Sequence, residues 1–387
     1  MLNRRLLVGL GGICLLAAGC TQDDLGSNAP SPPSTVQEAA VEGAGVGFEL
    51  RIGMVLNISA PTAERDEQVR EVFDTAIRSS PSAAITSLEV VQIDEVEDAD
   101  DAVDALRGLG VTVLVTTCDD GTIPGVIEAG RRADMLVLTG CATIPQPEIP
   151  TDSELVFDTG ALATSTDAVA AALEELVRIQ DEPVFAVIAS DLVPDVANQC
   201  NVIEEALGAD AIIVSERFTG LVEDPTETLL ARSELLSSVD AVVVCALAPT
   251  VGEVVSTLRA NGIEQPIVVP WFSDPQLWPE DTNDVWVVSP SSRHGDDPSL
   301  EVNSLYRSID QPESTDVVAA DTLSILVDTA QRTGSANPNE LGEALQEGPI
   351  EALSGELTLN RLGQVERAYR LIEVIDGTPE FSELIDP

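Results

Sequence analysis

The order of apolar and amphipathic segments constrains the fold of this chain more than any other feature. From residue 49 onward, short apolar runs typical of buried strands alternate with segments whose apolar residues recur at helical spacing. We expect the strands of this first repeat at residues 50–56, 88–93, 111–115 and 135–138, and its helices at residues 63–77, 99–109 and 123–132. Alternation of this kind requires right-handed crossovers and a parallel sheet.

The same alternation begins again after Pro150. We expect the second set of strands at residues 154–157, 183–189, 211–214, 241–244 and 266–269, and the helices at residues 164–179, 193–207, 227–236 and 251–258. Hydrophobic residues make up 44% of the chain and aromatic residues only 3%, so the core is aliphatic, as in parallel α/β proteins. Two such repeats predict two doubly wound sheets, whose ligands bind at the carboxyl ends of the strands.

The last third of the chain has a different pattern. We expect a strand at 285–288, helices at 317–332 and 340–345, and a β-hairpin of residues 355–359 and 369–374 around a turn at 362–364. Such an ending indicates that the chain passes between the lobes more than once, which makes a hinge that permits closure on a ligand. The predicted fold class is α/β, with two doubly wound parallel-sheet lobes joined by a multi-strand hinge and a ligand cleft between them.

The predicted boundaries follow from these patterns. The first lobe takes residues 49–158 plus about 285–338, and the second takes residues 159–284 plus about 339–387. The hinge therefore lies where the chain leaves one repeat for the other.

The N-terminus has the anatomy of an export signal. Arg4 and Arg5 precede an apolar run over residues 6–18, which is too short for a permanent membrane span and ends in small residues before Cys20. A Cys in this place resembles a bacterial lipobox, with Ala17 where Leu is preferred. We predict a signal peptide at 1–19, lipidation of Cys20, a flexible tether at 20–48 and an extracytoplasmic body anchored to the cell membrane; the alternative is an ordinary secretory signal with a chance Cys.

Charge restricts the partners of this protein. The chain has 19 basic and 67 acidic residues, for a formal net charge of −48. Such a field repels nucleic acids and anionic lipids, so we expect no nucleic-acid partner and membrane contact only through the lipid anchor. Steering over long range favours neutral, zwitterionic or cationic ligands.

Four cysteines remain in the exported body, and an oxidising compartment favours disulfides between them. Four cysteines allow three pairings. We favour Cys118–Cys141 and Cys200–Cys245, because each pair falls within one predicted lobe and near strand ends. A metal site is a poor alternative, since no CxxC motif occurs and His294 is the only histidine.

The sequence contains no motif of an enzyme. GxSxG, the P-loop and HExxH are all missing, and His294 lies in a segment, 293–297, that is typical of a solvated loop. We therefore predict a protein that is not an enzyme and uses no cofactor.

Polar loops follow two of the predicted strands. Residues 116–121 leave the third strand and residues 139–143 leave the fourth. Their hydroxyl and backbone N–H groups suit a carboxylate, and an acidic side chain across the cleft suits an ammonium group. The alternative is that these Thr and Asp residues only cap the helices that follow.

Several segments in order resemble the leucine/isoleucine/valine-binding proteins of ABC transporters. The resemblance covers roughly residues 49 to 376 and is carried by residues 51–56, 67–70, 115–118, 141–143 and 353–359. It implies the type I periplasmic binding fold, capture of a small amino-acid-like ligand between the lobes, and delivery to an ABC permease at the membrane.

The resemblance also implies a set of ligand-binding residues. They are Thr117, Cys118, Asp119, Ala142 and Thr143 in the first lobe, and Asp191, Leu247, Trp271, Phe272 and Asp274 in the second. The sequence departs from the family in two places. Asp119 replaces a small hydroxyl residue, and the second-lobe loops at 191–193 and 246–248 lack the tyrosines usual in the family. The alternative hypothesis is an anchored interaction or regulatory protein that keeps the fold but not the ligand pocket.

Overall fold

The computed structural model describes one compact unit within residues Ala44–Pro387. The described residues are 49–60, 62–79, 85–118, 121–140, 155–160, 162–178, 180, 182–191, 194–218, 225–246, 248–275, 277–309 and 312–386. The predicted signal peptide, Cys20 and the tether lie outside them. No helix in this described part is long and apolar enough to cross a membrane.

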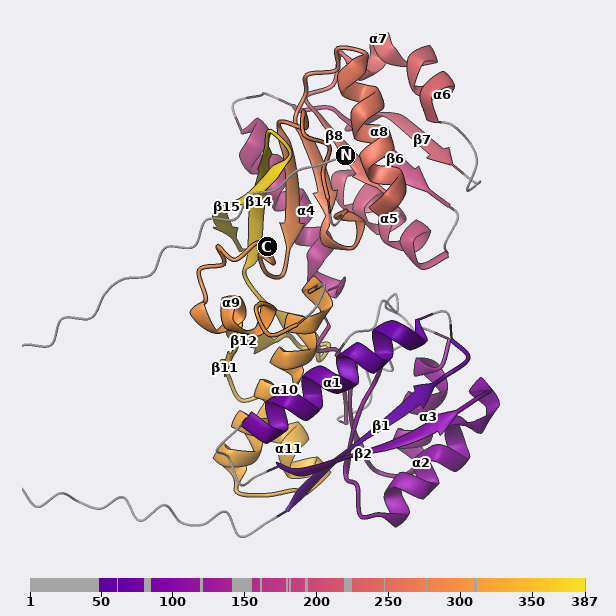
Figure 1. Ribbon diagram of the computed structural model, residues 1–387, viewed down its shortest axis with the longest axis vertical. Coiled ribbons are helices and arrows are strands. Elements are labelled where there is room, and N and C mark those ends of the chain that lie inside the picture. Colours follow the sequence, from indigo (N-terminus) through magenta and orange to yellow (C-terminus); the bar gives the residue numbers. More distant parts are fainter. Residues whose placement is uncertain are drawn as a thin grey trace, which may run out of the picture. The chain divides into compact units, whose positions relative to one another are not determined.

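Five parallel strands form the first sheet, in the order β2-β1-β3-β4-β5 (Figure 1). They are β1 Leu50–Asn57, β2 Ile85–Ile93, β3 Val113–Val115, β4 Leu136–Leu138 and β5 Val156–Phe157. The helices of this lobe are α1 Ala63–Ser79, η1 Val96–Asp98, α2 Ala99–Gly108, α3 Ile123–Arg132, α10 Ser314–Thr333 and α11 Pro338–Leu345. We call this sheet with its helices the first lobe.

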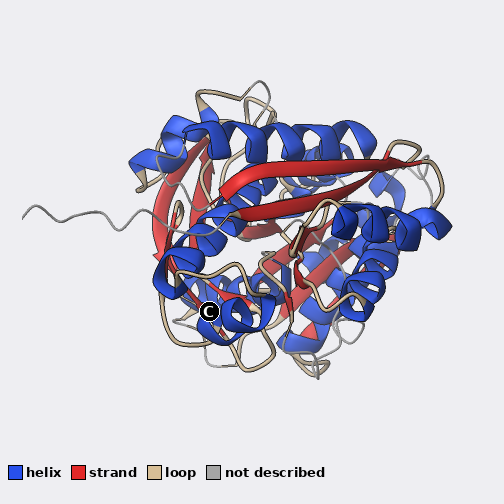
Figure 2. Cartoon of the chain, turned by 90° about the horizontal axis from the view of Figure 1, so that it is seen from below, coloured by secondary structure: helices blue, strands red, loops and turns tan. Residues whose placement is uncertain are grey.

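Helices cover both faces of the first sheet, as Figure 2 shows from below. The side chains of a strand alternate between its faces, so Met54 packs with α1, α10 and α11, whereas Val55 packs with α2 and α3. Val113 and Leu114 of β3 divide in the same way. The central strands β1 and β3 are therefore apolar on both sides, and the prediction of a doubly wound parallel sheet is confirmed.

Seven strands form the second sheet, in the order β15-β14-β10-β9-β8-β6-β7. They are β6 Phe185–Ser190, β7 Ile212–Phe218, β8 Ala241–Cys245, β9 Ile267–Pro270, β10 Val285–Ser289, β14 Tyr369–Ile375 and β15 Thr378–Ile385. Strands β6 to β10 are parallel, whereas β14 and β15 add an antiparallel edge. The helices of this second lobe are α4 Leu162–Val177, α5 Pro194–Leu207, α6 Pro225–Ala231, α7 Ser233–Leu236, α8 Ala248–Ala260 and η2 Trp271–Ser273.

Both faces of the second sheet are also covered. Val187 and Val243 pack with α4 and α5, whereas Ile188 and Val244 pack with α6, α7 and α8. The helix expected at 227–236 is divided at Arg232 into α6 and α7.

The predicted hairpin near the C-terminus is wrong. Strand β12 (Gly355–Leu359) pairs with β11 (Ile350–Ala352) and with the short β13 (Val365–Glu366), not with β14. Strand β14 pairs instead with β10, about 80 positions earlier in the chain. The turn at residues 360–364 returns the chain for only two residue pairs, after which β14 enters the second sheet.

The chain passes between the lobes three times within the described residues. The first crossing is residues 158–160, after β5; the second is residues 290–299, between β10 and α9 (Leu300–Tyr306); the third is residues 367–368, between β13 and β14. We call these three segments the hinge. Two segments lie in the other lobe from the one predicted. Strand β10 was expected in the first lobe but belongs to the second sheet, and residues 341–365 were expected in the second lobe but contribute to the core of the first.

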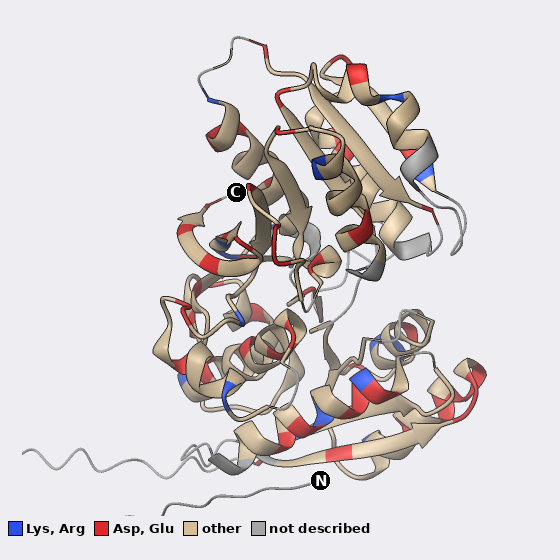
Figure 3. Ribbon diagram, turned by 45° about the horizontal axis from the view of Figure 1, so that its top comes forward, with Lys and Arg blue, Asp and Glu red and all other residues tan. Residues whose placement is uncertain are grey.

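Acidic residues occur on helices and loops of both lobes and outnumber the basic ones (Figure 3). In the part of the chain that the structure covers, no group of three or more His, Cys, Asp or Glu side chains has an arrangement able to hold a metal ion. The acidity is therefore distributed and does not form one charged patch.

Candidate functional site

The loop after β3 begins with two buried threonines, Thr116 and Thr117. The Thr116 Oγ1 atom is buried and has no hydrogen-bond partner among the described residues. The next backbone N–H, of Cys118, donates to Asp66 Oδ1 at 2.7 Å. Asp66 is itself fully buried and also accepts from Thr62 Oγ1 at 3.0 Å, so a carboxylate at the start of α1 fixes this loop.

Asp66 and Asn57 belong to the site region and were missed by the sequence analysis. Asn57, the last residue of β1, donates through Nδ2 to Thr122 Oγ1 at 3.1 Å and accepts at Oδ1 from the Ser59 N–H at 3.1 Å. In the sequence, the indication that Asn57 belongs to a site is that a polar residue directly follows an apolar strand. Asp66 looked like an ordinary acidic residue in the first turn of a helix.

Strand β4 ends against the hinge. Thr139 Oγ1 donates to Asp158 Oδ1 at 3.1 Å, and the Gly160 N–H donates to the same oxygen at 3.0 Å. Burial raises the pKa of the Asp158 carboxyl to about 6, and these two hydrogen bonds oppose that rise. A Cβ at Gly140 would lie 2.6 Å from Thr322 Oγ1, so only glycine lets β4 end this close to α10. The predicted residues Asp119, Ala142 and Thr143 lie outside the described residues.

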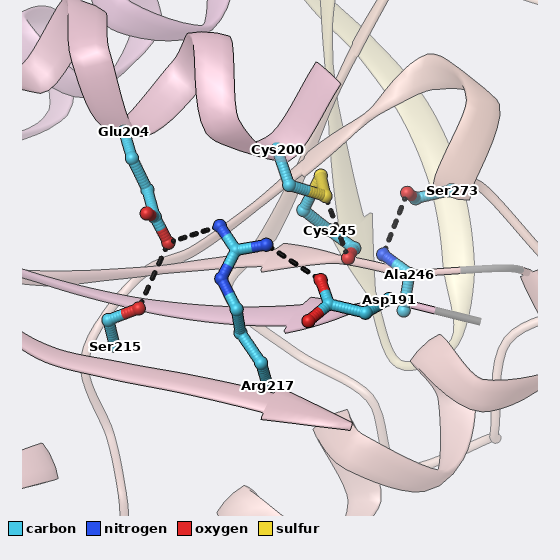
Figure 4. The surroundings of a disulfide bond; sticks show 8 residues. All are labelled: Asp191, Cys200, Glu204, Ser215, Arg217, Cys245, Ala246 and Ser273. Carbon is cyan, nitrogen blue, oxygen red and sulfur yellow. Dashed lines mark hydrogen bonds and ion pairs between the residues drawn. A yellow bond between two sulfur atoms is a disulfide. The ribbon is translucent and has the colours of Figure 1, made fainter. Parts of the chain in front are cut away.

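In the second lobe, Asp191 follows β6 and is part of an ionic network (Figure 4). The Arg217 guanidinium lies 2.7 Å from Asp191 Oδ1 and 3.0 Å from Glu204 Oε1. Ser215 Oγ donates to the same Glu204 oxygen at 3.0 Å. Asp191 is thus held at the carboxyl end of its strand by a cation from the neighbouring strand β7.

A disulfide joins Cys200 of α5 to Cys245, the last residue of β8 (Figure 4). Both cysteines are fully buried, and the predicted pairing Cys200–Cys245 is confirmed. The next residue, Ala246, donates its N–H to Ser273 Oγ at 3.2 Å and so links the ends of β8 and β9. Cys118 is also disulfide-bonded, and its predicted partner Cys141 lies outside the described residues, as does the predicted ligand residue Leu247.

Trp271 and Phe272 stand directly after β9. Their rings meet edge to face, with centroids 6.0 Å apart and an interplanar angle of 82°. The indole Nε1 of Trp271 is buried and has no hydrogen-bond partner among the described residues. This loop therefore presents aromatic surface and an unsatisfied donor at the carboxyl edge of the second sheet.

Asp274 lies in the same loop, but its carboxylate is already engaged. Oδ2 lies 2.9 Å from Arg293 Nη2, and Oδ1 accepts from Trp278 Nε1 at 3.2 Å. Burial raises the pKa of Asp274 to about 6, opposed in part by the Arg293 charge and the Trp278 hydrogen bond.

The segment 293–297 is not the solvated loop that we expected. The Arg293 side chain is only 10% exposed, and Asp297 is buried in an ion pair with Arg370. Burial, together with the charge of Arg293, lowers the pKa of His294 to about 4. The partners of Arg293 and Asp297 are Asp274 and Arg370, which are too distant in sequence for local polarity to reveal.

The candidate residues form two sets, one at the carboxyl edge of each sheet. In the first lobe the candidate residues follow the adjacent strands β1, β3 and β4. In the second lobe they follow the adjacent strands β6, β8 and β9. A cavity of about 690 Å³ lies beside the third crossing and is lined by residues such as Arg367, Arg370 and Glu366. None of the predicted ligand residues that the structure describes lines this cavity, so it is separate from the described residues of both sets.

Comparison with known proteins agrees with this architecture. A family model described as a periplasmic binding protein matches residues 49–379. No curated protein sequence matches the chain.

Several solved structures share the fold. An ABC transporter substrate-binding protein from Sphaerobacter thermophilus is 15% identical, with a TM-score of 0.69 over 88% of this chain and 98% of that one. A branched-chain amino acid transporter substrate binding protein from Streptococcus pneumoniae, in complex with isoleucine, is 16% identical, with a TM-score of 0.63 over 88% and 100%. A solute binding protein of an ABC transporter from Rhodopseudomonas palustris, in complex with p-hydroxybenzoic acid, is 14% identical, with a TM-score of 0.65 over 88% and 96%.

Proposed function

Since the chain belongs to the family of periplasmic binding proteins, we propose that it is the solute-binding component of an ABC importer. In this proposal it captures a small amino-acid-like or amide ligand between its lobes and delivers it to a membrane permease. It catalyses no reaction.

Two unsatisfied buried groups at the strand ends carry the proposal. Thr116 Oγ1 lies after β3 and Trp271 Nε1 after β9, and neither has a partner among the described residues. A buried hydroxyl or N–H without a partner costs about 1–3 kcal/mol, and a ligand that bonds to it recovers that free energy. Both groups lie at the carboxyl ends of parallel strands, where ligands of doubly wound folds bind.

The proposed ligand contacts come from both sets. In the first lobe Thr117, Cys118, Asp119, Ala142 and Thr143 would bind the carboxylate and amine of the ligand. In the second lobe Trp271, Phe272 and Leu247 would pack against its side chain, and Asp191 would bind the ammonium group. Asp191 keeps its carboxylate at the strand end because Arg217 holds it there.

The related structures support a ligand that contains a carboxylate. One holds isoleucine and another holds p-hydroxybenzoic acid, and both of these ligands carry that group. The net charge of −48 disfavours a purely anionic ligand, so a zwitterion agrees better with this chain.

The proposal includes a lipid anchor. Residues 1–19 would be removed as a signal peptide, Cys20 would be acylated, and residues 21–48 would form the tether between membrane and body. A Cys20→Ala variant should lose incorporation of a labelled fatty acid and leave the membrane fraction. Retention of the label by this variant would exclude Cys20 as the modified residue.

A second candidate is an anchored regulatory protein that binds another protein. The observation in its favour is that the Asp191 carboxylate is already paired with Arg217, which leaves fewer charged groups for a ligand. This candidate predicts no stabilisation by small molecules.

Thermal unfolding of the exported body, measured with a panel of L-amino acids, their amides and hydroxybenzoates, tests both candidates. A ligand at 100 times its dissociation constant should add about 2.7 kcal/mol to the free energy of unfolding. Thr143→Ala and Trp271→Phe should each weaken binding about fivefold, because each removes a hydrogen-bonding group. If no compound shifts the transition, the importer function is wrong and the regulatory candidate gains support.

A further inference from the structure

We infer that Asp274 and Arg293 are a positioning pair that couples the loop after β9 to the hinge. This inference deepens the proposed function, because that loop carries Trp271 and Phe272. It reassigns Asp274, which the family resemblance placed among the ligand contacts, to a role that acts through other residues.

The first step is the connection between the loop and the second crossing. Arg293 Nη2 lies 2.9 Å from Asp274 Oδ2 and donates to the Pro275 carbonyl at 2.6 Å. The Asp274 and Arg293 side chains are only 6% and 10% exposed. Since the other carboxylate oxygen of Asp274 accepts from Trp278, both oxygens are engaged within the protein, one by its own loop and one by the hinge.

The second step continues from Arg293 to the third crossing. The adjacent Ser292 donates its N–H to Asp297 Oδ2 at 2.7 Å. Asp297 in turn pairs with Arg370 of β14, whose Nε and Nη2 lie 3.0 and 3.2 Å from its two oxygens. Asp297 and Arg370 are buried, so their mutual orientation is held without competition from water.

The third step reaches the first crossing. Arg370 Nη2 donates to the Ser354 carbonyl at 2.7 Å, and Ser354 donates its N–H and hydroxyl to the two oxygens of Asp321. Asp321 Oδ2 pairs with Arg367 Nη1 at 2.9 Å, and Arg367 Nη2 donates to the Thr159 carbonyl at 3.1 Å. The network therefore runs from the aromatic loop through all three crossings and includes α10.

Such a network has a mechanical consequence. A rotation of the lobes changes the backbone conformation of the crossings. Arg293 passes that change to the loop of Trp271 and Phe272 through its contact with Asp274. Ligand contact at Trp271 and the state of the hinge are thus linked through one buried ion pair. A stripe of surface charges has no such effect, because exposed pairs are weak and solvent-screened.

Hydrogen–deuterium exchange on the full chain tests the coupling without any ligand. The variant is Asp274→Asn, which keeps the side-chain shape and an acceptor for Trp278 but removes the charge that binds Arg293. The amides to follow are in residues 271–278 and in residues 290–299, where Ser292, Asp297 and Ser299 N–H groups are protected by side chains. We expect exchange at least tenfold faster in both segments, with β6 and β8 unchanged.

Two further variants complete the experiment. Arg232→Gln removes another ion pair of the same lobe, in which the partly exposed Arg232 places its Nε 2.6 Å from Glu216 Oε1. This variant should change the exchange rate in neither segment. Arg293→Lys keeps the positive charge but replaces the planar guanidinium, whose Nη2 contacts both Asp274 and the Pro275 carbonyl, with an ammonium group of different reach, and should give an intermediate increase in both segments. Faster exchange restricted to residues 271–278, or a uniform increase in every segment, would overturn the coupling.

A binding measurement separates this inference from the proposed function. With L-isoleucine as probe, Asp274→Asn should raise the dissociation constant about tenfold, whereas Arg232→Gln leaves it unchanged. If isoleucine does not bind the unaltered protein, the measurement is made with a compound that shifts the transition in the thermal panel, and if no compound does, the proposed function is wrong. The exchange experiment still decides whether the loop and the hinge are coupled.

Discussion

The hinge and the loops at the strand ends are both polar and largely buried. Among the described residues each region has two buried side-chain atoms without a hydrogen-bond partner, but at the strand ends these are the only polar atoms of their side chains. In the hinge, Arg370 donates to Asp297 and to the carbonyls of Ala368 and Ser354. Among the described hinge residues, Arg367 Nε and His294 Nε2 are the buried side-chain atoms without a partner. At the strand ends, Thr116 Oγ1 and Trp271 Nε1 are both left without one.

This difference separates groups that stabilise the fold from groups that are kept for a ligand. A buried ion pair whose other atoms are also hydrogen-bonded loses little relative to water, while an orphaned hydroxyl reduces stability. Substitutions in the hinge should therefore destabilise the protein. Substitutions of the orphaned groups should leave stability unchanged or increase it while weakening ligand binding.

The largest expected effect is at the hinge ion pair. Arg370→Met should lower the free energy of unfolding by about 3–5 kcal/mol, because it leaves the Asp297 carboxylate buried without its cation. Urea denaturation measures this loss. The matched control is Arg332→Met, which removes a pair with Asp328 that is about one-third exposed and should cost no more than about 0.5 kcal/mol. Equal losses in the two variants would mean that the hinge is not a special source of stability.

The next effect is at the disulfide behind the loops of the second lobe. The double variant Cys200→Ala/Cys245→Ala should lose about 2–4 kcal/mol, because the bond closes a loop with a sequence separation of 45. Both side chains are buried, and alanine is apolar, so neither substitution places an unsatisfied polar group in the core. Chemical denaturation of this variant beside the unaltered protein measures the change. An unchanged midpoint would show that packing alone holds α5 to the end of β8.

Local patterns revealed the sheets and predicted a hinge, but they did not reveal the ion pairs that hold the hinge together. The strands could be predicted because residues such as Val113 and Leu114 are apolar on both faces of a buried sheet. The Cys200–Cys245 pair could be predicted because both residues lie near strand ends of one repeat. In contrast, the partner of Asp297 is Arg370, 73 residues later, and the local sequence around either residue does not indicate this pairing.

The wrong hairpin has the same physical origin. Residues 355–359 and 369–374 alternate as hairpin strands do, but pairing of β14 with β10 buries more apolar surface than a local hairpin can. The candidate site divides in the same manner. Thr117 and Trp271 could be found from their places after strands, whereas Asp66 could not, because only the folded chain brings α1 to the loop after β3.

A pH-dependent effect distinguishes the second crossing from the rest of the hinge. Burial lowers the pKa of His294 from 6.5 to about 4, so between these pH values the unfolded chain binds more protons than the folded one. The His294 contribution is therefore retained above pH 6.5 and lost as the pH falls towards 4, by up to about 3 kcal/mol.

The variant His294→Gln isolates this contribution. Asp158 and Asp274 have raised pKa values and contribute with the opposite sign, but they are present in both proteins and cancel in the difference. Relative to the unaltered protein, His294→Gln should gain stability steadily from pH 6.5 to pH 4 in urea titrations. A difference that does not vary with pH would show that the imidazole is solvated in the folded protein.

The smallest effect gives the sharpest comparison, since one chemical change is made in both regions. Thr322 is fully buried at the hinge side of α10, where its hydroxyl donates to the Val318 carbonyl and pairs with Thr159 Oγ1 at 2.9 Å. Thr116 is equally buried, but its hydroxyl has no partner among the described residues. Thr322→Val should cost about 1–2 kcal/mol, whereas Thr116→Val should gain about 1 kcal/mol, because it removes an unsatisfied polar group.

Ligand binding should respond in the reverse order to stability. Thr116→Val should weaken binding of the compound found in the thermal panel, and Thr322→Val should leave it within twofold. Measured together by denaturation and calorimetry, the two variants test whether the unsatisfied hydroxyl is kept for a ligand. If Thr116→Val loses stability as Thr322→Val does, the hydroxyl already has a partner in the folded protein, and the distinction between hinge and strand-end loops fails at that position.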